Sequence, residues 1–428
     1  MLKKHLGFVF LLAVATACTA LPPPPAPPAN TRPPTKLTLW HAYGGSFGEE
    51  FESLVADFNA AHPDIVVDPS YGGNLYTMRD KLLTAIAGNA APDVAQIDQF
   101  WSSELAQAGA IVRMEDFIDA DPGIDKADIL DKAWETATYN GEIWSMPFSL
   151  SNIALYYNKV LFEQAGLDPE KPPATWDELV EVGQVLTQDT DGDGAVDQWG
   201  LWFPSKINRG NVYYWFAFLW QAGGDIFDPD FTRAEFSGPA GVEALQFWRD
   251  LVHKHGIVPL APPEQGFEAG KIAMTFASTA RLNRYLAALG SDKLGMAPMP
   301  GHARRATGIG GANLAILSTA KDRQAAWEFV KWMTSPETNL RWSMETGYLP
   351  LRRSVIQSDT YQAYLEKEPR ARTILEQMPD AVVRPNIPAY APASREVGLA
   401  IEDVLFNDAD PQTALDTAAA KANALLQK

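Results

Sequence analysis

The segment Gly44–Gly48 has the spacing of a nucleophile elbow, with Ser46 in the position of the attacking hydroxyl. It lies between a predicted strand and a predicted helix, so it could support ester or amide hydrolysis. In hydrolases, however, the elbow follows a central strand with an oxyanion-hole strand upstream, and here only a proline-rich segment comes before it. The context favours a glycine-rich ligand loop. A secreted serine hydrolase is kept as the remote alternative.

A second pattern is an acidic loop with the spacing of a calcium site. Carboxylates stand at positions 1, 3, 5 and 9 of that loop, namely Asp189, Asp191, Asp193 and Asp197. Gly194 holds position 6, where a sharp turn is needed, but position 12 is Gly200 rather than a bidentate glutamate. We expect this loop to bind a structural Ca²⁺. The alternative is an acidic Asp-Gly turn without a metal.

Other chemistries find little support in the chain. His253 and His255 are close in sequence but have no further candidate metal ligand beside them. There is no phosphate-binding P-loop, and Gly308–Gly311 lacks the strand–helix context of a dinucleotide site. A pair of glycosidase carboxylates cannot be located from sequence alone. We therefore expect no catalytic residues and no cofactor required for function.

Composition describes a two-lobe protein with an acidic surface. At 428 residues the chain is longer than one hydrophobic core usually organises. Its formal net charge is -18, from 53 acidic and 35 basic residues. A nucleic-acid partner would require a basic face, so this balance argues against one. It leaves a small ligand open, because one local cation can dominate the field in a closed cleft.

The N-terminal residues predict export and attachment. Lys3 and Lys4 precede a short apolar run over Leu6–Ala15, and small residues then lead to Cys18, the only cysteine. We interpret residues 1–18 as a lipoprotein signal peptide with lipidation at Cys18, although Ala15 replaces the usual leucine and leaves simple secretion as the alternative. Residues 19–36 are rich in proline and predict an extended tether.

The folded chain begins near Leu37 and alternates between strands and helices. Strands are predicted at 36–41, 65–67 and 93–97, with amphipathic helices over 51–58 and 78–87 between them. Such alternation indicates a mainly parallel sheet covered by helices. Ligands of such sheets bind beyond the carboxyl ends of the strands, which here are the loops at 43–45, 71–76 and 98–101. The aromatic run 213–220 is interpreted as helix packing.

Several segments recur in this order in family 1 extracellular solute-binding proteins, and together they identify the chain as similar to that family from Leu37 to Gln427. They are Trp40-His41, Ala87–Asn89, Pro92-Asp93, Pro147-Phe148, Leu155–Lys159, Ala165–Pro169, Thr175-Trp176, Gly310–Ala312, Thr346–Pro350 and Ala414–Asp416. Within the family, the chain looks most similar to the glycerol-3-phosphate-binding component of an ABC importer.

The resemblance implies an α/β fold of two lobes, the type II-like periplasmic-binding-protein (clamshell) fold with hinge crossovers. It implies a first lobe over 37–150 and about 296–342. The second lobe would comprise 151–295 and about 343–428.

The resemblance also implies ligand contacts, which we expect at Ser151, Trp176, Ser278, Gly311, Tyr348, Arg395, Tyr76, Gln99 and Asp98. Arg395 would bind a phosphoryl group through a charge-assisted fork, and the hydroxyl groups would donate further hydrogen bonds. Trp176 would form an apolar wall. Two positions depart from the family: Leu75 stands where a tyrosine is usual, with Tyr76 one place on, and Gln99 replaces a carboxylate, beside Asp98. Both departures affect the glycerol end of the site.

We therefore expect a binding protein that captures glycerol-3-phosphate or a glycerophosphodiester by lobe closure and passes it to ABC permease subunits. An oligosaccharide-binding member of the same family is the alternative. The protein is expected to be a monomer in the periplasm or on the outer face of the cell membrane, held by its lipid anchor.

Overall fold

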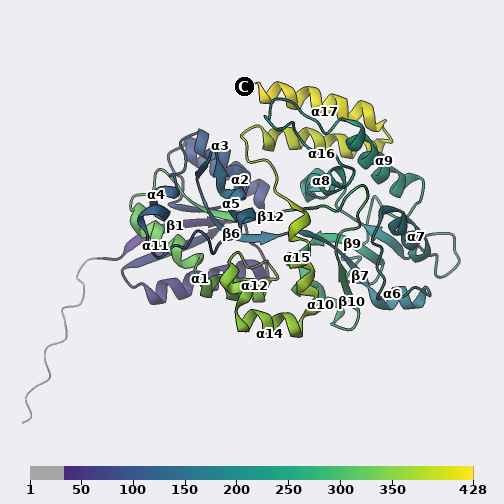
Figure 1. Cartoon of the computed structure of the whole chain (residues 1–428), viewed down its shortest axis with the longest axis horizontal. Coiled ribbons are helices and arrows are strands. Elements are labelled where there is room, and N and C mark those ends of the chain that lie inside the picture. The colour runs from purple at the N-terminus through teal and green to yellow at the C-terminus, as the bar shows by residue number, and fades with distance from the viewer. Residues whose placement is uncertain (1–32, 428) are drawn as a thin grey trace, which may run out of the picture.

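The computed structural model describes residues 33–427, except for the side chains of Tyr76 and Arg209. The predicted signal peptide, Cys18 and the tether up to residue 32 lie outside the described part. The chain forms two α/β lobes that lie side by side (Figure 1). Among residues 33–427, none of the helices combines the length and the hydrophobicity needed to cross a bilayer.

The first lobe is built on a five-stranded sheet in the order β2-β1-β3-β12-β6. Its strands are β1 (Thr35–His41), β2 (Ile65–Tyr71), β3 (Val94–Asp98), β6 (Met146–Ser151) and β12 (Gly310–Ile316). β1 is parallel to β2 and β3, whereas β12 runs antiparallel to β3 and β6. Every residue of β3 and β6 is buried, which requires cover on both faces of the sheet.

The second lobe contains a four-stranded sheet in the order β10-β7-β9-β8. Its strands are β7 (Ile153–Asn158), β8 (Trp199–Trp202), β9 (Ile272–Ser278) and β10 (Leu294–Ala297). β7 is antiparallel to both of its neighbours, and β8 is parallel to β9. Two short pairs complete the strands: β4 (Thr138–Tyr139) with β5 (Glu142–Ile143), and β11 (Thr307–Gly308) with β13 (Ala381–Val382).

Helices surround both sheets (Figure 1). Those of the first lobe are α1 (Ser46–Ala61), α2 (Leu75–Ala87), α3 (Trp101–Gln107), α4 (Glu115–Ala120), α5 (Asp131–Ala137), α11 (Arg323–Met333) and α12 (Pro336–Thr346). Those of the second lobe are α6 (Lys159–Gln164), α7 (Trp176–Leu186), α8 (Asn211–Gln221), α9 (Pro239–His253), α10 (Leu282–Leu289), α16 (Tyr390–Asn407) and α17 (Pro411–Leu426). Between the lobes run α13 (Arg353–Gln357), α14 (Asp359–Lys367) and α15 (Arg372–Glu376).

Side-chain caps set where many of these helices begin. Asn74, Thr175, Asp322 and Ser335 each accept a hydrogen bond from the backbone amide three residues later. Such a cap satisfies one of the amides that the first helical turn leaves without a partner. Pro336 follows Ser335 as the first residue of α12, where a missing amide hydrogen costs nothing.

The chain passes between the lobes three times. β6 continues into β7 through Asn152, β11 continues into β12 through Ile309, and α13–α15 make the third connection. Asn152 is fully buried and ties the connections together, because its amide nitrogen Nδ2 donates to Ile374 O at 2.9 Å and its backbone amide donates to Thr279 Oγ1 at 3.2 Å.

The two-lobe α/β fold with hinge crossovers, implied by the resemblance, is therefore confirmed. The boundaries differ in detail from the predicted ones. β10 pairs with β7 in the second lobe, so the chain returns to the first lobe at β12 rather than near residue 296.

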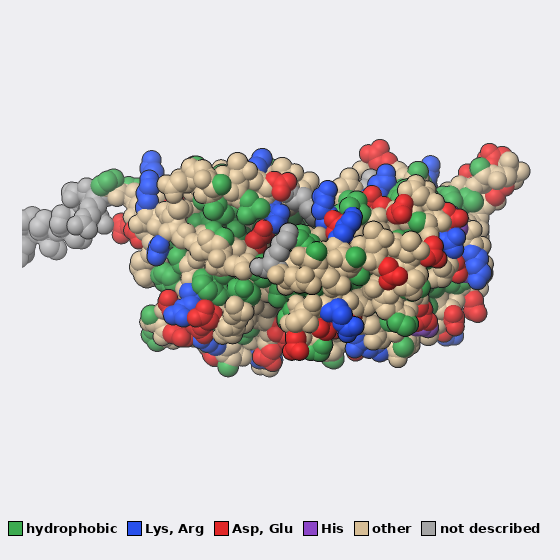
Figure 2. Space-filling view, turned by 90° about the horizontal axis from the view of Figure 1, so that it is seen from above, with side chains coloured by type: hydrophobic (Ala, Val, Ile, Leu, Met, Phe, Trp, Pro, Cys, Tyr) green, Lys and Arg blue, Asp and Glu red, His purple; other side chains and the backbone are tan. Residues whose placement is uncertain are grey.

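The molecular surface is mixed in character. On the face shown in Figure 2, basic and acidic side chains are interspersed and hydrophobic side chains appear in small groups. This is the usual composition of a surface in contact with water.

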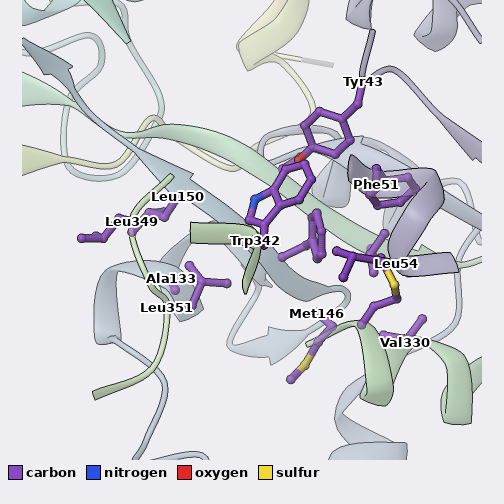
Figure 3. Packing of buried hydrophobic residues seen from close by; sticks show 14 of the residues in the cluster. Tyr43, Phe51, Leu54, Ala133, Met146, Leu150, Val330, Trp342, Leu349 and Leu351 are labelled. Carbon is purple, nitrogen blue, oxygen red and sulfur yellow. The ribbon is translucent and has the colours of Figure 1, made fainter. Parts of the chain in front are cut away.

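An aromatic cluster packs α12 against α1 and β6 within the first lobe (Figure 3). The Trp342 ring lies 4.9 Å, centroid to centroid, from the rings of both Tyr43 and Phe148. Phe51 of α1 packs edge-on against Phe148 at 5.4 Å. Trp342 also stacks on Tyr348 at 5.6 Å, so the same cluster supports the start of the segment that leads to the second lobe.

We expect Trp342→Ala to lower the free energy of unfolding by about 3–5 kcal/mol, because it leaves a cavity in this cluster. Denaturant unfolding followed by circular dichroism measures the change. Phe231→Ala is the matched control, since the Phe231 side chain is 42% exposed and its loss should cost about 0.5 kcal/mol or less. Equal losses in the two variants would contradict the role assigned to the cluster.

Candidate functional site

A set of polar side chains gathers where strands of the two sheets end and the lobes meet. We call it the interlobe cluster, and it comprises Asp98, Gln99, Ser151, Tyr213, Ser278, Tyr348 and Arg384. Asp98 ends β3, Ser151 ends β6 and Ser278 ends β9. The carboxyl ends of such strands are the usual place for ligands in α/β sheets.

A buried ion pair forms the centre of the cluster. Arg384 Nη2 lies 3.1 Å from Asp98 Oδ1, and the two side chains are only 9% and 11% exposed. The guanidinium carbon lies 4.7 Å from the ring centroid of Phe100 and 5.2 Å from that of Tyr213. Arg384 thus contacts Asp98 and Phe100 of the first lobe and Tyr213 of the second, through charge and through the ring faces.

Burial and pairing act in opposite directions on Asp98. Burial raises the pKa of its carboxyl group, and the Arg384 charge lowers it; the net result is a pKa above the usual value. The carboxylate form of Asp98 therefore depends on Arg384.

Hydroxyl groups line the cluster on the side of the chain crossings. Ser278 Oγ donates to Ser151 Oγ at 3.0 Å, which links β9 to β6. The Tyr213 hydroxyl donates to Gly308 O at 3.1 Å. Gly311 allows β12 to approach β6 closely: its φ is +135°, and a Cβ added there would lie 2.0 Å from Ser149 O.

The phenol of Tyr348 is influenced by charges of opposite sign. Burial raises its pKa to about 12, with the positive charge of Arg281 acting against the rise and the negative charge of Asp98 adding to it. The phenol is therefore a neutral hydrogen-bond donor at physiological pH.

Two members of the cluster have buried polar atoms without partners among the described residues. Neither the oxygen nor the nitrogen of the Gln99 amide is hydrogen-bonded, and neither is Nε of Arg384. Leaving such atoms unpaired costs about 1–3 kcal/mol each, and a native protein usually satisfies them. Other buried atoms without partners, among them the indole nitrogens of Trp215 and Trp248, lie elsewhere among residues 33–427, so the unpaired atoms of the cluster indicate a ligand only together with its position between the lobes.

Trp176 does not belong to this site, contrary to the prediction. Its ring is stacked at 4.3 Å against Phe247 and at 4.3 Å against His302, and its indole nitrogen donates to Gln221 Oε1 at 2.7 Å. With these contacts and an exposed fraction of 3%, it is a core residue of the second lobe.

The arginine of the cluster is Arg384 rather than the predicted Arg395. The charges that act on Asp98, Tyr213 and Tyr348 are those of Arg384 and Arg281. Arg395 is exposed on α16, on the side opposite the stripe that packs into the second lobe. The sequence held one clue to Arg384, because it lies between an apolar dipeptide and Pro385 rather than in a polar segment.

The remaining predicted ligand residues are placed as follows. Ser151, Ser278, Gly311, Tyr348, Asp98 and Gln99 come together, whereas the Tyr76 side chain lies outside the described part. Ser46 is exposed in the first turn of α1. The histidine nearest to Ser46 in sequence, His41, is fully buried; its Nε2 lies 3.2 Å from Glu52 Oε1, and burial lowers its pKa.

The predicted calcium loop is exposed, and three of its four predicted aspartates lie close together. Carboxylate oxygens of Asp189, Asp191 and Asp197 lie within 4.8 Å of one another. The carboxylate of Asp193 is not in this group and accepts from the Ala195 amide at 2.7 Å. Hydrogen bonds from Thr190 lower the pKa of Asp197.

Comparison with known proteins decides the family. Residues 53–369 match the model of the bacterial extracellular solute-binding proteins. The chain belongs to this family. A relative solute-binding protein, the sn-glycerol-3-phosphate-binding periplasmic protein UgpB of Pectobacterium atrosepticum, is 29% identical over 94% of this chain and 93% of its own length.

Two solved structures of similar solute-binding proteins share the fold. UgpB from Mycobacterium tuberculosis, in complex with glycerophosphocholine, has a TM-score of 0.82 with 26% identity and covers 92% of this chain and 98% of its own. The cyclic alpha-maltosyl-1,6-maltose binding protein of Arthrobacter globiformis has a TM-score of 0.77 with 32% identity, and the match covers 92% of this chain and 99% of its own. The present solute-binding protein is accordingly the substrate-binding component of an ABC importer and not an enzyme.

We expect Arg384→Met to lower the free energy of unfolding by about 3–5 kcal/mol at pH 7, because Asp98 is left as a buried charge without a partner. The pKa of Asp98, already raised by burial, should rise further. The native state of the variant then binds a proton that the unfolded state does not. Its loss in free energy of unfolding, relative to the unaltered protein, should therefore shrink as the pH falls from 7 to 5. Urea unfolding at both pH values measures this deficit.

The control for this experiment is the double variant Asp98→Asn/Arg384→Met, which has no acid at position 98. Its deficit should not depend on pH in this range. A single variant whose deficit is the same at pH 5 and pH 7 would contradict the dependence of Asp98 on Arg384.

Proposed function

We propose that this protein captures glycerol-3-phosphate or a glycerophosphodiester at the interlobe cluster and presents it to the importer. The observation that carries the proposal is that three buried polar atoms without partners, Arg384 Nε and both atoms of the Gln99 amide, lie together in the interlobe cluster. An anionic oxygen would satisfy the guanidinium with a charge-assisted hydrogen bond. A ligand hydroxyl, which both donates and accepts, would satisfy the amide.

The charges of the cluster favour a diester among these ligands. Asp98 already neutralises Arg384, and Arg281 is a further cation, exposed and close enough to Tyr348 to affect its pKa. One surplus positive charge matches the single negative charge of a phosphodiester. A phosphate monoester would bring a second negative charge close to the carboxylate of Asp98.

The relatives support ligands of this class. One relative is named for sn-glycerol-3-phosphate, and another was crystallised with glycerophosphocholine. An oligosaccharide is the second candidate, because the Arthrobacter globiformis relative binds a cyclic maltosyl-maltose and the neutral Asp98–Arg384 pair would also accept and donate to sugar hydroxyls.

Closure of the lobes would select the ligand, since only the closed form offers both sets of contacts. We also propose that the protein acts as a monomer on a lipid anchor at Cys18, with residues 19–36 as the tether. A lipoprotein cysteine carries several acyl chains, as stable anchoring requires.

Arg384→Lys should weaken binding of glycerol-3-phosphate and glycerophosphocholine by about tenfold to a hundredfold, because lysine keeps the charge but cannot form the fork. Isothermal titration calorimetry measures the affinities. Arg395→Ala is the matched control and should bind within about twofold of the unaltered protein. If only the Arg395 variant lost affinity, Arg395 and not Arg384 would be the ligand-binding arginine. If the protein bound maltose-type sugars and none of the phosphate esters, the oligosaccharide would replace the phosphate ester as the ligand.

The acidic loop gives a separate proposal, a structural Ca²⁺ held by Asp189, Asp191 and Asp197. Adding Ca²⁺ to chelator-treated protein should then raise the melting temperature by about 2–5 °C, since a ligand of the native state stabilises it. Differential scanning calorimetry measures the shift. Asp189→Asn should abolish it, and Asp230→Asn, a change at another exposed loop position, should not. Equal melting temperatures with Ca²⁺ and with chelator would contradict the proposal.

A further inference from the structure

One segment of the chain runs between the two lobes. Residues 383–389, which we call the strap, connect the end of β13 to the start of α16, and Figure 1 shows the chain rising between the lobes from α15 to α16. Two side chains of the strap contact the first lobe, Arg384 and Asn386. The contact of Arg384 with Asp98 belongs to the interlobe cluster, whereas Asn386 contacts a different part of the first lobe.

The Asn386 side chain makes three hydrogen bonds to backbone groups of the first lobe. Its Oδ1 accepts from the Ser103 amide at 3.1 Å, and its Nδ2 donates to Thr138 O at 3.0 Å and to Thr136 O at 3.4 Å. A reversed side-chain amide would place its nitrogen against the Ser103 N–H and its oxygen against the two carbonyl groups. We call these three backbone groups the socket, and they accept an asparagine in one orientation.

A buried polar network holds the socket in place within the first lobe. Thr136 O also accepts from Asn313 Nδ2 at 3.1 Å, and the same nitrogen donates to Ser145 Oγ at 3.0 Å. Ser145 Oγ lies 2.9 Å from the hydroxyl of Ser102, which precedes Ser103. The four side chains of this network are at most 1% exposed. Because a buried network with its hydrogen bonds made is rigid, we expect the socket to keep its shape when Asn386 leaves it.

The socket lies at the start of α3, directly after two residues of the interlobe cluster. Asp98 and Gln99 precede Phe100, and Phe100 stands at the cap position of α3 without a side-chain hydrogen bond to the helix. Asn386 supplies an acceptor for the Ser103 amide from 283 positions away. Asn386 therefore holds the turn that follows Asp98 and Gln99 at the same time as it holds the strap.

We propose that Asn386 is a positioning residue that latches the two lobes together, and that this latch engages before a ligand binds. All three of its partners are backbone groups of the protein, so none of its hydrogen bonds requires a ligand. The ion pair of Asp98 with Arg384 acts in the same direction. So does the packing of Phe100 against Tyr390 of α16, with ring centroids 4.8 Å apart. A ligand then completes contacts that are already partly assembled, and the latch slows its release.

This inference rests on the lobe closure proposed above, but not on the identity of the ligand. The test measures the distance between the lobes in the full chain by double electron–electron resonance. Spin labels are attached at exposed positions of α2 and α17, as Asp80→Cys and Thr417→Cys, with Cys18→Ser so that no other thiol is labelled.

Two variants remove the latch in different ways. Asn386→Ala removes all three hydrogen bonds, and Asn386→Asp keeps an acceptor for the Ser103 amide but places an oxygen against the two carbonyl groups. Asn407→Ala is the matched control, because the exposed Asn407 side chain donates to Asp403 Oδ1 at 2.9 Å within α16.

We expect the unaltered protein without ligand to populate a closed distance, and both Asn386 variants to lower the ratio of closed to open molecules about tenfold. Dissociation of glycerophosphocholine, followed by stopped-flow tryptophan fluorescence, should be about tenfold faster in both variants, with association within about twofold. The Asn407 variant should match the unaltered protein in each measurement. A residue that only stabilised the fold would lower the urea midpoint and leave the closed-to-open ratio unchanged.

Two results would overturn the inference. One is an unaltered protein that shows only the open distance without ligand, and the other is a pair of Asn386 variants with an unchanged closed-to-open ratio. If the ratio falls as expected but neither glycerol-3-phosphate nor glycerophosphocholine binds, the ligand assignment fails and the latch stands. If these esters bind and the ratio does not change, the latch fails and the proposed function stands.

Discussion

A buried ion pair joins the two lobes of this protein. Two charges removed from water are stable only if each neutralises the other, so Asp98 and Arg384 are in contact wherever both are buried, as they are here. This requirement fixes the end of β3 against the segment that follows β13. Asn386, two residues beyond Arg384, reinforces the junction by accepting from the Ser103 amide at 3.1 Å and donating to Thr138 O at 3.0 Å.

The same pair explains why the site is suited to binding rather than to reaction. Its charges are already balanced, and Tyr348 keeps its proton because burial raises its pKa to about 12. The unpaired atoms of Gln99 are an amide donor and acceptor that do not titrate. Groups of this kind hold a polar molecule in one orientation, and none of them is poised to exchange a proton with it at neutral pH.

The strands that set the site could largely be predicted from sequence. Alternating or continuous apolar runs indicated β1, β2 and β3. The loops after these strands were expected at the site because ligands bind beyond the carboxyl ends of parallel strands, and Asp98 and Gln99 lie there. β8 was missed, because Trp199–Trp202 is short and follows the acidic loop without a clear alternation. The aromatic run of α8 was predicted as packing, and Trp215, Phe216 and Trp220 are indeed fully buried, but Tyr213 at its start turns to the interlobe cluster.

Side-chain partners were harder to predict, for a physical reason. Trp176 and Arg395 were inferred from positions in a resemblance, yet contact depends on which neighbours fold back from distant parts of the chain. His302 closes one face of Trp176 from 126 positions away, and Arg384 reaches Asp98 across 286. Neither distance leaves a local pattern in the sequence.

The three connections between the lobes have a mechanical consequence. A body attached at one point can swivel in any direction, whereas a body attached at several neighbouring points along a line keeps only rotation about that line. Asn152, Ile309 and Ile374 bring the three connections into hydrogen-bonding contact, through Asn152 to Ile374 and through Ile309 to Val382. If the lobes open as proposed, these contacts would restrict the motion mainly to rotation about the line of the connections, and one pair of labels, one on each lobe, would follow it.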